Sequence, residues 1–311
     1  MTVYGVTGAA LSLAGRICEA LHVRGAERIV GVDATSPRAD LAGFEFHAMD
    51  VRDPRLAAIW REAGVRTVIH LAAMLDPIRD RREMRSRVLD GTRNVLKAAK
   101  ACNAEQILFL SSAAVYGAHP DNPPRLIETR PLHPNPFGCA ANKAEAERVV
   151  LEFAAANLKV RVAVLRPAIV LGPRSVDFVA RSFQQPRLLL PSGADAELQF
   201  LHEDDLLTAC VAVLEKGRAG TWNLAGRDSM RLSACLARLG TRPVLLPPPL
   251  LRLALALSWA LRLPLTEAPP SIVPYLLHPW LVDTERAAQE LGFVPRHSAA
   301  EAFESFLKSF A

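Results

Sequence analysis

The first half of the chain alternates short apolar runs, rich in β-branched residues, with alanine-rich segments of helical periodicity. The apolar runs are RIVGVD, TVIHLAA, QILFLSS and VRVAVLRP, at residues 28–33, 67–73, 106–112 and 160–167. Strands that are apolar throughout are typical of a parallel sheet with helices on both faces. The alternation therefore predicts an α/β fold with a doubly wound parallel sheet, in which ligands bind at the carboxyl ends of the strands.

The segment VYGVTGAALSLAGRI, residues 3–17, has the pattern of a buried strand, a tight turn and the start of a helix. In Rossmann-type sheets this turn holds the pyrophosphate of a dinucleotide. Leu11 stands at a position in the turn where a close approach by phosphate calls for glycine. The turn therefore raises the question of whether a dinucleotide binds.

The length of 311 residues suits a nucleotide-binding domain with a smaller partner domain. Beyond LRPAIVLGP, at 165–173, the alternation fades and prolines recur. We predict a dinucleotide-binding domain over 1–170, to which 196–220 returns, and a smaller α/β substrate-binding domain over 171–311. Residues 198–215 have the pattern of a strand followed by a helix, and the proline-rich segment 117–136 predicts an ordered loop over the sheet edge or the site.

Composition bounds the class of protein. Hydrophobic residues make up 50% of the chain and charged residues 22%, which excludes a disordered protein. The net charge of +5 owes much to RDRREMRSR at 79–87, which we interpret as a solvated helix face and not as a nucleic-acid site, because no aromatic side chain is there to stack on bases. Five scattered cysteines without metal-ligand spacing favour a reduced interior and no metal site. With the first strand expected from Val3, no leader is expected, and the predicted location is cytoplasmic.

The most apolar segment is PLLRLALALSWALRLPL, residues 249–265. Arg252 and Arg262 leave only nine residues between them, short of the roughly 20 that a membrane span needs. We expect a core or domain-packing helix. Two alternatives stay open: a helix that lies in a membrane interface, and the wall of a pocket for an apolar substrate.

Several motifs occur in an order that resembles the extended short-chain dehydrogenase/reductase family, the NAD-dependent epimerase/dehydratase group. They are VTGAA, GVD, MDVRD (49–53), VIHLAA, LDGTRNVLKAA (89–99), LFLSSAAVYG (108–117), NKAEAE (142–147), LRPAIVLGP, LQFLHEDDL (198–206) and DTERAAQELGFVPRHS (283–298). The resemblance covers nearly the whole chain. It implies a Rossmann-type domain followed by a smaller substrate domain.

The family's glycine turn, TGxxGxxG, falls on Thr7, Gly8, Leu11 and Ala14. Either the turn has shifted, with Gly15 serving in a loop longer by one residue, or it binds no ligand. Asp33 ends the second strand, where a carboxylate accepts ribose hydroxyls and repels a 2′-phosphate, which favours NAD over NADP. The resemblance assigns further residues to the cofactor site: Asp50, Val51, Leu71, Ala72, Ala73, Lys143, Arg166 and Pro167.

The resemblance also implies a Ser, Tyr, Lys arrangement for proton transfer, in which Ser112 and Lys143 take the serine and lysine positions. The tyrosine position, four residues before Lys143, is Cys139, and the alternative register gives Phe137. A thiol near Lys143 could ionise near neutral pH and act through a water, or Cys139 is a small buried filler. Tyr116 is the remaining phenol in the motif region, and we expect it to be structural or substrate-facing.

Two functions remain open from the sequence. The first is an NAD-dependent oxidoreductase or epimerase/dehydratase-like enzyme acting on an alcohol or ketone, such as a nucleotide sugar or a sterol-like apolar alcohol. The second is a catalytically silent relative that senses a nucleotide or binds a protein. The resemblance implies a small-molecule substrate, and a homodimer packed through 88–102 and 139–156; no nucleic acid and no membrane span are expected.

Overall fold

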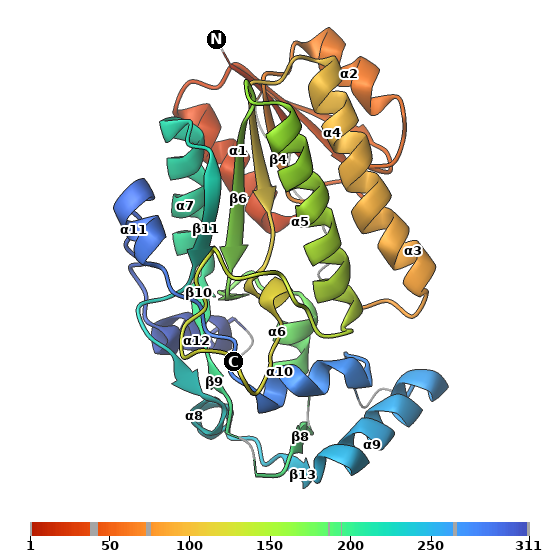
Figure 1. Cartoon of the computed structure of the whole chain (residues 1–311), viewed down its shortest axis with the longest axis vertical. Coiled ribbons are helices and arrows are strands. Elements are labelled where there is room, and N and C mark those ends of the chain that lie inside the picture. The colour runs from red at the N-terminus through yellow and green to blue at the C-terminus, as the bar shows by residue number, and fades with distance from the viewer. Residues whose placement is uncertain are drawn as a thin grey trace.

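Seven parallel strands form the central sheet of the computed structural model, which describes residues 2–37, 43–72, 76–185, 187–193, 195–263 and 266–309. The strand order places β1 near the middle, with the chain winding first to one edge and then to the other (Figure 1). From edge to edge the strands are β11 (Gly220–Leu224), β6 (Arg161–Pro167), β5 (Gln106–Leu110), β4 (Thr67–His70), β1 (Val3–Thr7), β2 (Arg28–Asp33) and β3 (Phe44–Ala48). The predicted doubly wound parallel sheet is confirmed.

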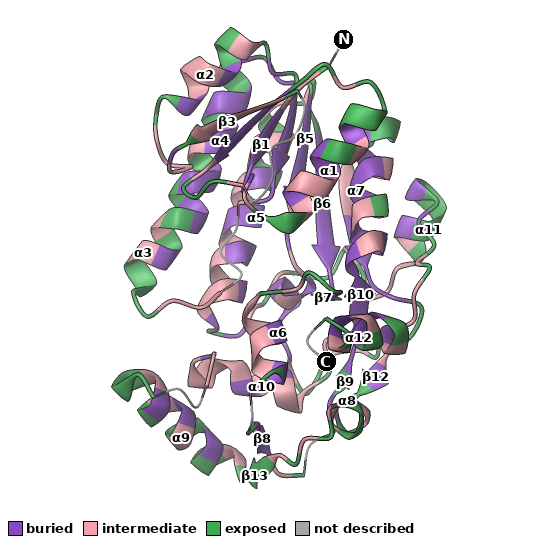
Figure 2. Cartoon of the chain, turned by 180° about the vertical axis from the view of Figure 1, so that it is seen from behind, coloured by how far each residue is buried: buried purple, intermediate pink, exposed green. Residues whose placement is uncertain are grey.

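Helices cover both faces of this sheet. One face packs against α1 (Ser12–Val23), α7 (Glu203–Lys216) and α11 (Glu285–Leu291). The other face packs against α2 (Leu56–Ala63), α4 (Gly91–Ala101) and α5 (Gly138–Ala156), and α3 (Arg81–Arg85) runs into α4 through a π-helical turn, Ser86–Asp90. Strands β2, β4, β5 and β6 of the central sheet are mostly buried (Figure 2).

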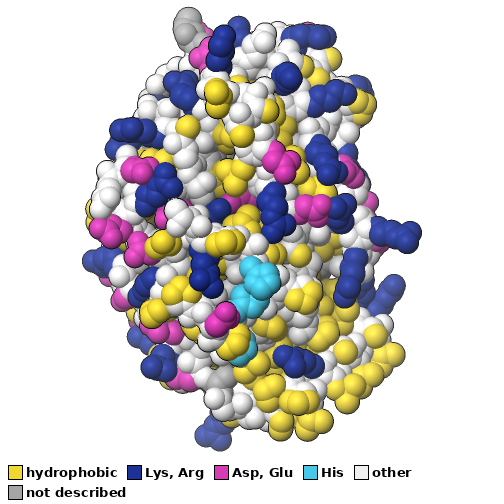
Figure 3. All heavy atoms as spheres, in the orientation of Figure 1, with side chains coloured by type: hydrophobic (Ala, Val, Ile, Leu, Met, Phe, Trp, Pro, Cys, Tyr) yellow, Lys and Arg dark blue, Asp and Glu magenta, His cyan; other side chains and the backbone are white. Residues whose placement is uncertain are grey.

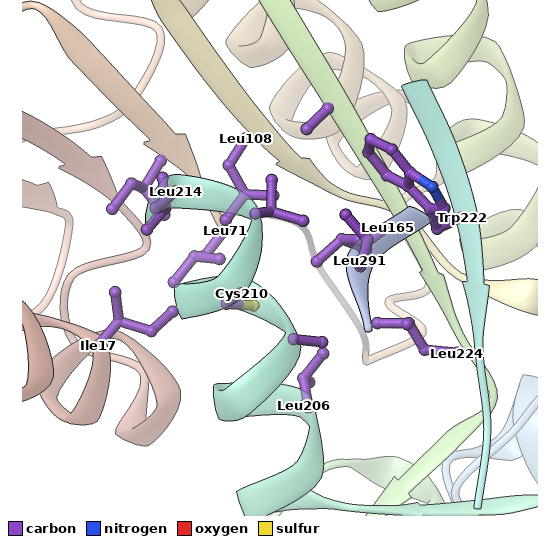
Figure 4. Close-up of a cluster of buried hydrophobic side chains, with 14 of the residues drawn as sticks. Ile17, Leu71, Leu108, Leu165, Leu206, Cys210, Leu214, Trp222, Leu224 and Leu291 are labelled. Carbon is purple, nitrogen blue, oxygen red and sulfur yellow. The ribbon is translucent and has the colours of Figure 1, made fainter. Parts of the chain in front are cut away.

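The first of these two interfaces joins segments far apart in the sequence. Helix α7 packs Leu206, Cys210 and Leu214 in one cluster with Leu108 of β5 and with Leu71, which follows β4 (Figure 4). Strand β11 adds Trp222 and Leu224, and α11 adds Leu291. Residues of α7, β11 and α11 are therefore part of the core of the large sheet, and of these elements only α7 lies within the segment 196–220 that was predicted to return.

The smaller part of the structure has three two-stranded sheets and five helices within the described residues. The strand pairs are β7 (Ile169–Leu171) with β10 (Phe200–His202), β8 (Leu189–Pro191) with β13 (Val244–Leu246), and β9 (Glu197–Leu198) with β12 (Met230–Arg231). The helices are α6 (Phe178–Phe183), α8 (Leu232–Leu239), α9 (Pro248–Leu261), α10 (Val273–Leu277) and α12 (Ala299–Leu307). The division into domains at residue 170 stays a prediction.

The apolar segment at 249–265 forms α9 over its described part, and only one side of it packs. Leu251 and Leu255 are buried with Val273 of α10, whereas Leu253 and Leu257 are more than half exposed. The expected packing helix thus has a second, exposed apolar face. Within the described residues, no helix combines the length and the apolar character that crossing a bilayer requires.

Candidate active site

A cavity of about 610 Å³ lies at the carboxyl ends of the central strands. Leu11 follows β1, Leu71 follows β4, Ser112 follows β5 and Pro167 ends β6, and all four line the cavity. The opposite wall comes from the smaller part, with Phe178, Leu189, Leu255 and Tyr275 among its residues. The volume falls in the range of small-molecule sites, and the position is the one that open α/β sheets use for ligands.

The glycine turn forms one end of the cavity. Gly8 has a φ of +74°, and a Cβ there would lie 2.8 Å from the amide nitrogen of Ala72, so only glycine fits. Leu11 donates its amide to the Gly8 carbonyl at 3.0 Å and is the N-cap of α1. Its side chain is 39% exposed, lines the cavity and makes no capping hydrogen bond. The start of α1 therefore faces a space in which an anion can bind.

Ala14 and Gly15 follow Leu11 in the sequence and lie inside α1. Ala14 is fully buried, which fits the close helix–strand packing expected of the last turn position. Gly15 lies inside α1, and a Cβ there would meet nothing within 4 Å. The suggestion that Gly15 replaces the missing close-approach glycine is therefore wrong, because the helix already begins at Ser12.

These residues fit a dinucleotide, because a left-handed glycine, an uncapped helix start and a cavity occur together, with Leu11 at the edge of the cavity. Asp33 ends β2 as expected, and its Oδ2 accepts the amide of Ala10 in the turn at 3.2 Å. The second oxygen accepts the amide of Thr35 at 3.0 Å. The carboxylate thus ties β2 to the turn on which a cofactor would rest.

Asp50 and Val51, the residues expected beside an adenine, form hydrogen bonds with nearby side chains of the protein. Both carboxylate oxygens of Asp50 accept hydrogen bonds from the Arg52 guanidinium, which lower the pKa of the Asp50 carboxyl. Arg52 also forms an ion pair with Glu83 at 2.9 Å. The Val51 carbonyl accepts the Asn94 amide at 2.8 Å. An adenine contact by Asp50 and Val51 stays a prediction. Leu71 is buried and lines the cavity, whereas Ala73 lies outside the described residues.

Ser112 and Lys143 both line the cavity. Ser112 caps a short 3-10 helix, Ala113–Tyr116, with its Oγ accepting the Ala114 amide at 3.2 Å. Lys143, on α5, donates from Nζ to the Leu110 carbonyl at 2.8 Å and is almost fully buried. Burial lowers the pKa of the Lys143 ammonium to about 7, against the opposing effect of Glu147. Both protonation states of Lys143 are thus populated near neutral pH.

Cys139 lies one turn before Lys143 on α5 and also lines the cavity. Burial raises the pKa of its thiol to about 12, and Asp76 raises it further, whereas Lys143 lowers it. Of the two alternatives for Cys139, the raised pKa favours the buried filler over the ionised thiol, because desolvation outweighs the nearby cation. Cys139 is a protonated, half-buried side chain beside the lysine.

Two residues expected at the cofactor are buried, and their contact with a cofactor stays a prediction. Arg166 is buried and donates from Nε to Glu147 Oε1 at 2.9 Å and from Nη1 to the Tyr116 hydroxyl, so it does not line the cavity. Thr7 is buried with its Oγ1 at 2.6 Å from Nδ1 of His70. A resemblance fixes the place of these residues on their strands but not the side to which their side chains turn.

The structure adds two site residues that the sequence did not indicate. Tyr275, from α10, lines the cavity and donates its hydroxyl to the Ala114 carbonyl at 2.8 Å, and burial raises its pKa. Arg16, one turn into α1, lines the cavity next to Leu11 and pairs with Glu203 at 3.4 Å and with Asp204. Tyr116, by contrast, is a buried structural residue whose hydroxyl bonds Asn223 at 2.8 Å.

A second group of titratable side chains lies outside the cavity. His202, Asp204 and His297 bring their ligand-type atoms within 4.8 Å of one another. Arg16 donates a hydrogen bond to the Asp204 carboxylate, and Nδ1 of His297 lies 3.0 Å from Oδ2 of Asp205. We interpret the group as part of the packing between α7 and the C-terminal segment.

The sheet, the positive-φ glycine turn and the Ser–Lys pair on one cavity define a dinucleotide-binding α/β protein. The model of the family described as "NAD dependent epimerase/dehydratase family" matches residues 4–225. The chain therefore belongs to the NAD-dependent epimerase/dehydratase family, as the motifs predicted.

The chain is also similar to individual known proteins. An uncharacterised protein of Mycobacterium tuberculosis is 29% identical over 312 residues, covering 97% of this chain and 82% of that protein. An Escherichia coli O157:H7 protein, N-acetyl-alpha-D-glucosaminyl-diphospho-ditrans,octacis-undecaprenol 4-epimerase, is 35% identical over 129 residues, 40% of this chain and 37% of that one. The solved UDP-glucose 4-epimerase of Thermus thermophilus, in complex with NAD, has a TM-score of 0.77 at 23% identity, with 99% of both chains covered.

Proposed function

We propose that this protein is an NAD-dependent oxidoreductase or epimerase that acts on an alcohol or ketone carbon of a diphosphate-linked sugar. The observation that carries the proposal is that the buried Lys143 and Ser112 line one cavity, which Leu11 of the glycine turn also lines. The family and its relatives supply the substrate class. When bound, NAD exchanges a hydride with the substrate carbon, and the protein must move the matching proton.

Lys143 is our candidate for the group that moves this proton. Its pKa of about 7 lets the ammonium give a proton to a substrate oxygen and lets the resulting amine take one back from solvent. Ser112 is placed to orient that oxygen, because its Oγ lines the same cavity. The Cys139 thiol, with a pKa of about 12, is a much poorer partner for exchange at neutral pH.

The cofactor would rest on the turn at Gly8, the start of α1 and Asp33. Arg16 would add positive charge beside the turn, where Leu11 restricts the approach of a phosphate. Arg174 also lines the cavity, but it pairs at 2.8 Å with Glu203, the carboxylate that Arg16 contacts as well. The exposed Arg187 lines the wall of the cavity and is suited to a substrate diphosphate.

The test begins with calorimetric titration of nucleotide-free protein with NAD⁺ and NADH, with NADP⁺ as the control. We expect NAD to bind in the micromolar range and Asp33→Ala to weaken it. A panel of nucleotide sugars, followed by the absorbance of reduced cofactor and by product chromatography, then reports turnover. Ser112→Ala and Lys143→Met should each lower turnover by about 10²–10⁴-fold while a folded protein remains.

The second candidate, a catalytically silent nucleotide-binding relative, is favoured by the protonated Cys139 at the tyrosine position. Micromolar NAD binding without turnover of any sugar in the panel would support it, particularly if Cys139→Tyr then gained turnover. Retained turnover in a Ser112→Ala, Lys143→Met double variant would refute the proposed acid–base chemistry. A folded sample that binds no NAD would refute the enzyme proposal itself.

A further inference from the structure

Helix α9 and strand β13 present a continuous segment of exposed apolar side chains. Within the described residues, seven of the fourteen exposed large hydrophobic side chains lie between residues 244 and 263. Their exposed fractions run from 41% to 65%: Val244, Leu245, Leu250, Leu253, Leu257, Leu261 and Leu263. We call these residues the leucine face. Figure 3 shows hydrophobic side chains gathered at the lower right of the molecule, where α9 lies in Figure 1.

The leucine face is an ordered side of α9, because the helix is held in place by packing on its other side. Leu250, Leu253, Leu257 and Leu261 recur at helical spacing, while Leu251 and Leu255 pack inward. Arg79 further fixes the helix, because its guanidinium lies 4.5 Å above the ring of Trp259 and its Nε donates to the Trp259 carbonyl at 3.0 Å. Large exposed apolar patches on a folded protein mark contact with a partner or a membrane.

The charges around the leucine face indicate which partner it fits. Residues 229–266 contain five arginines and no aspartate or glutamate. Arg242, Arg252 and Arg262 are exposed, and none of them forms an ion pair with the described part of the chain. Leucines flanked by unpaired arginines are the composition of a helix that lies in the interface of an anionic membrane. A second copy of this chain would bring arginines against arginines, which is unfavourable.

We propose that the leucine face docks this protein peripherally on an anionic lipid surface, with α9 lying along the interface. The docking proposal goes beyond the proposed enzymatic function and does not depend on it. One consequence does rest on that function: Leu255, on the inner side of α9, lines the cavity, so docking holds this wall of the site at the lipid surface. A sugar carried on a membrane lipid would then be within reach of the cavity.

The experiment is co-sedimentation of the full-length protein with vesicles of equimolar phosphatidylcholine and phosphatidylglycerol, with pure phosphatidylcholine vesicles as the comparison. We expect binding to the anionic vesicles that weakens as salt rises. Replacing Arg242, Arg252 and Arg262 together by glutamine should weaken binding about a hundredfold, at about fivefold for each basic side chain near the surface. The variant Leu253→Gln, Leu257→Gln, Leu261→Gln should weaken it at least about tenfold.

Matched controls lie at the far end of the molecule. Val23→Gln, Leu151→Gln, Leu158→Gln removes three exposed apolar side chains elsewhere, and Arg61→Gln, Lys100→Gln, Lys159→Gln removes three exposed charges elsewhere. Both control variants should bind vesicles like the wild type, and all variants should keep its circular dichroism and thermal midpoint.

The proposal is overturned if the wild type does not sediment with anionic vesicles, or if the leucine variant and its control bind equally. It is also overturned if the leucine variant instead converts a dimer into a monomer in sedimentation velocity while vesicles bind neither form. That result would make the leucine face a subunit interface. None of these outcomes depends on turnover, so failure of docking and failure of the proposed function are distinguishable.

Discussion

Replacing the buried Lys143 by methionine should stabilise the protein at low pH and not at high pH. Burial holds the pKa of Lys143 at about 7 in the folded state, against 10.5 for a free lysine side chain. Between these two values the unfolded chain carries one proton more than the folded protein, so stability rises with pH across this window. Below it, the full cost of burying the ammonium is present.

The size of the effect follows from the two pKa values. Their difference of about 3.5 corresponds to about 5 kcal/mol of destabilisation at about pH 6, at about 1.4 kcal/mol per pKa unit. At about pH 9 a difference of about 1.5 is left, so the cost falls to about 2 kcal/mol. Losing the hydrogen bond to the Leu110 carbonyl costs the variant about 2 kcal/mol at either pH. Lys143→Met should therefore be about 3 kcal/mol more stable than wild type at about pH 6 and about equal at about pH 9.

Urea unfolding followed by tryptophan fluorescence at the two pH values measures this change. Lys97 is an exposed lysine on α4, and Lys97→Met is the matched control, which should change stability equally at both pH values. If the Lys143→Met and wild-type stabilities run parallel with pH, the lysine does not titrate in this window. The acid–base role proposed for Lys143 would fall with that result.

Three further predictions concern the cofactor turn and the buried ion pair. Leu11→Gly removes the side chain that lines the cavity at the phosphate position and should tighten NAD binding about tenfold in calorimetry; unchanged affinity would show that Leu11 does not restrict the site. Gly8→Ala should cost about 1–3 kcal/mol of stability and weaken NAD binding, because the φ of Gly8 is +74°. Gly15→Ala, inside α1, should instead stabilise the protein by about 0.5–1 kcal/mol. Urea unfolding that ranks the stabilities of the two variants the other way would contradict this prediction. Arg166→Met should lower the free energy of unfolding by about 3–5 kcal/mol, because it leaves Glu147 charged and buried. Adding Glu147→Leu should recover most of that loss of stability. Equal stability of the single and double variants would contradict the importance of the ion pair.

The local sequence pattern was enough to predict the strands of the central sheet and two residues that line the cavity. Residues 28–33 form β2 with the predicted bounds, and residues 200–216 form the predicted strand and helix, because apolar runs and a carboxylate-rich helix start are local signals. The proline-rich segment 117–136 has no helix or strand longer than a bridge, as its composition predicted. Ser112 and Lys143 also meet at one cavity, as the motif spacing implied.

What the sequence did not contain was the environment of each side chain. The ionisation of Cys139 depends on how deeply α5 is buried, and the direction of Arg166 depends on Glu147, nineteen residues earlier on another element. Tyr275 reaches the cavity from α10, more than a hundred residues after the motif region, and no local pattern marks it. These are tertiary effects, and they decide the chemistry more than the motif does.

The order in which the core is completed has a consequence for synthesis on the ribosome. Six of the seven central strands emerge within the first 167 residues, but the face that contains Leu71 and Leu108 is covered by α1 alone until α7 and α11 complete it. Those helices leave the exit tunnel after the whole segment between β6 and β10 has been made, and α11 comes almost last. The nascent sheet therefore has an apolar face that a chaperone must shield. A chain that stops at residue 170 would keep that face permanently, so the nucleotide-binding half is not a module that can be transplanted by itself.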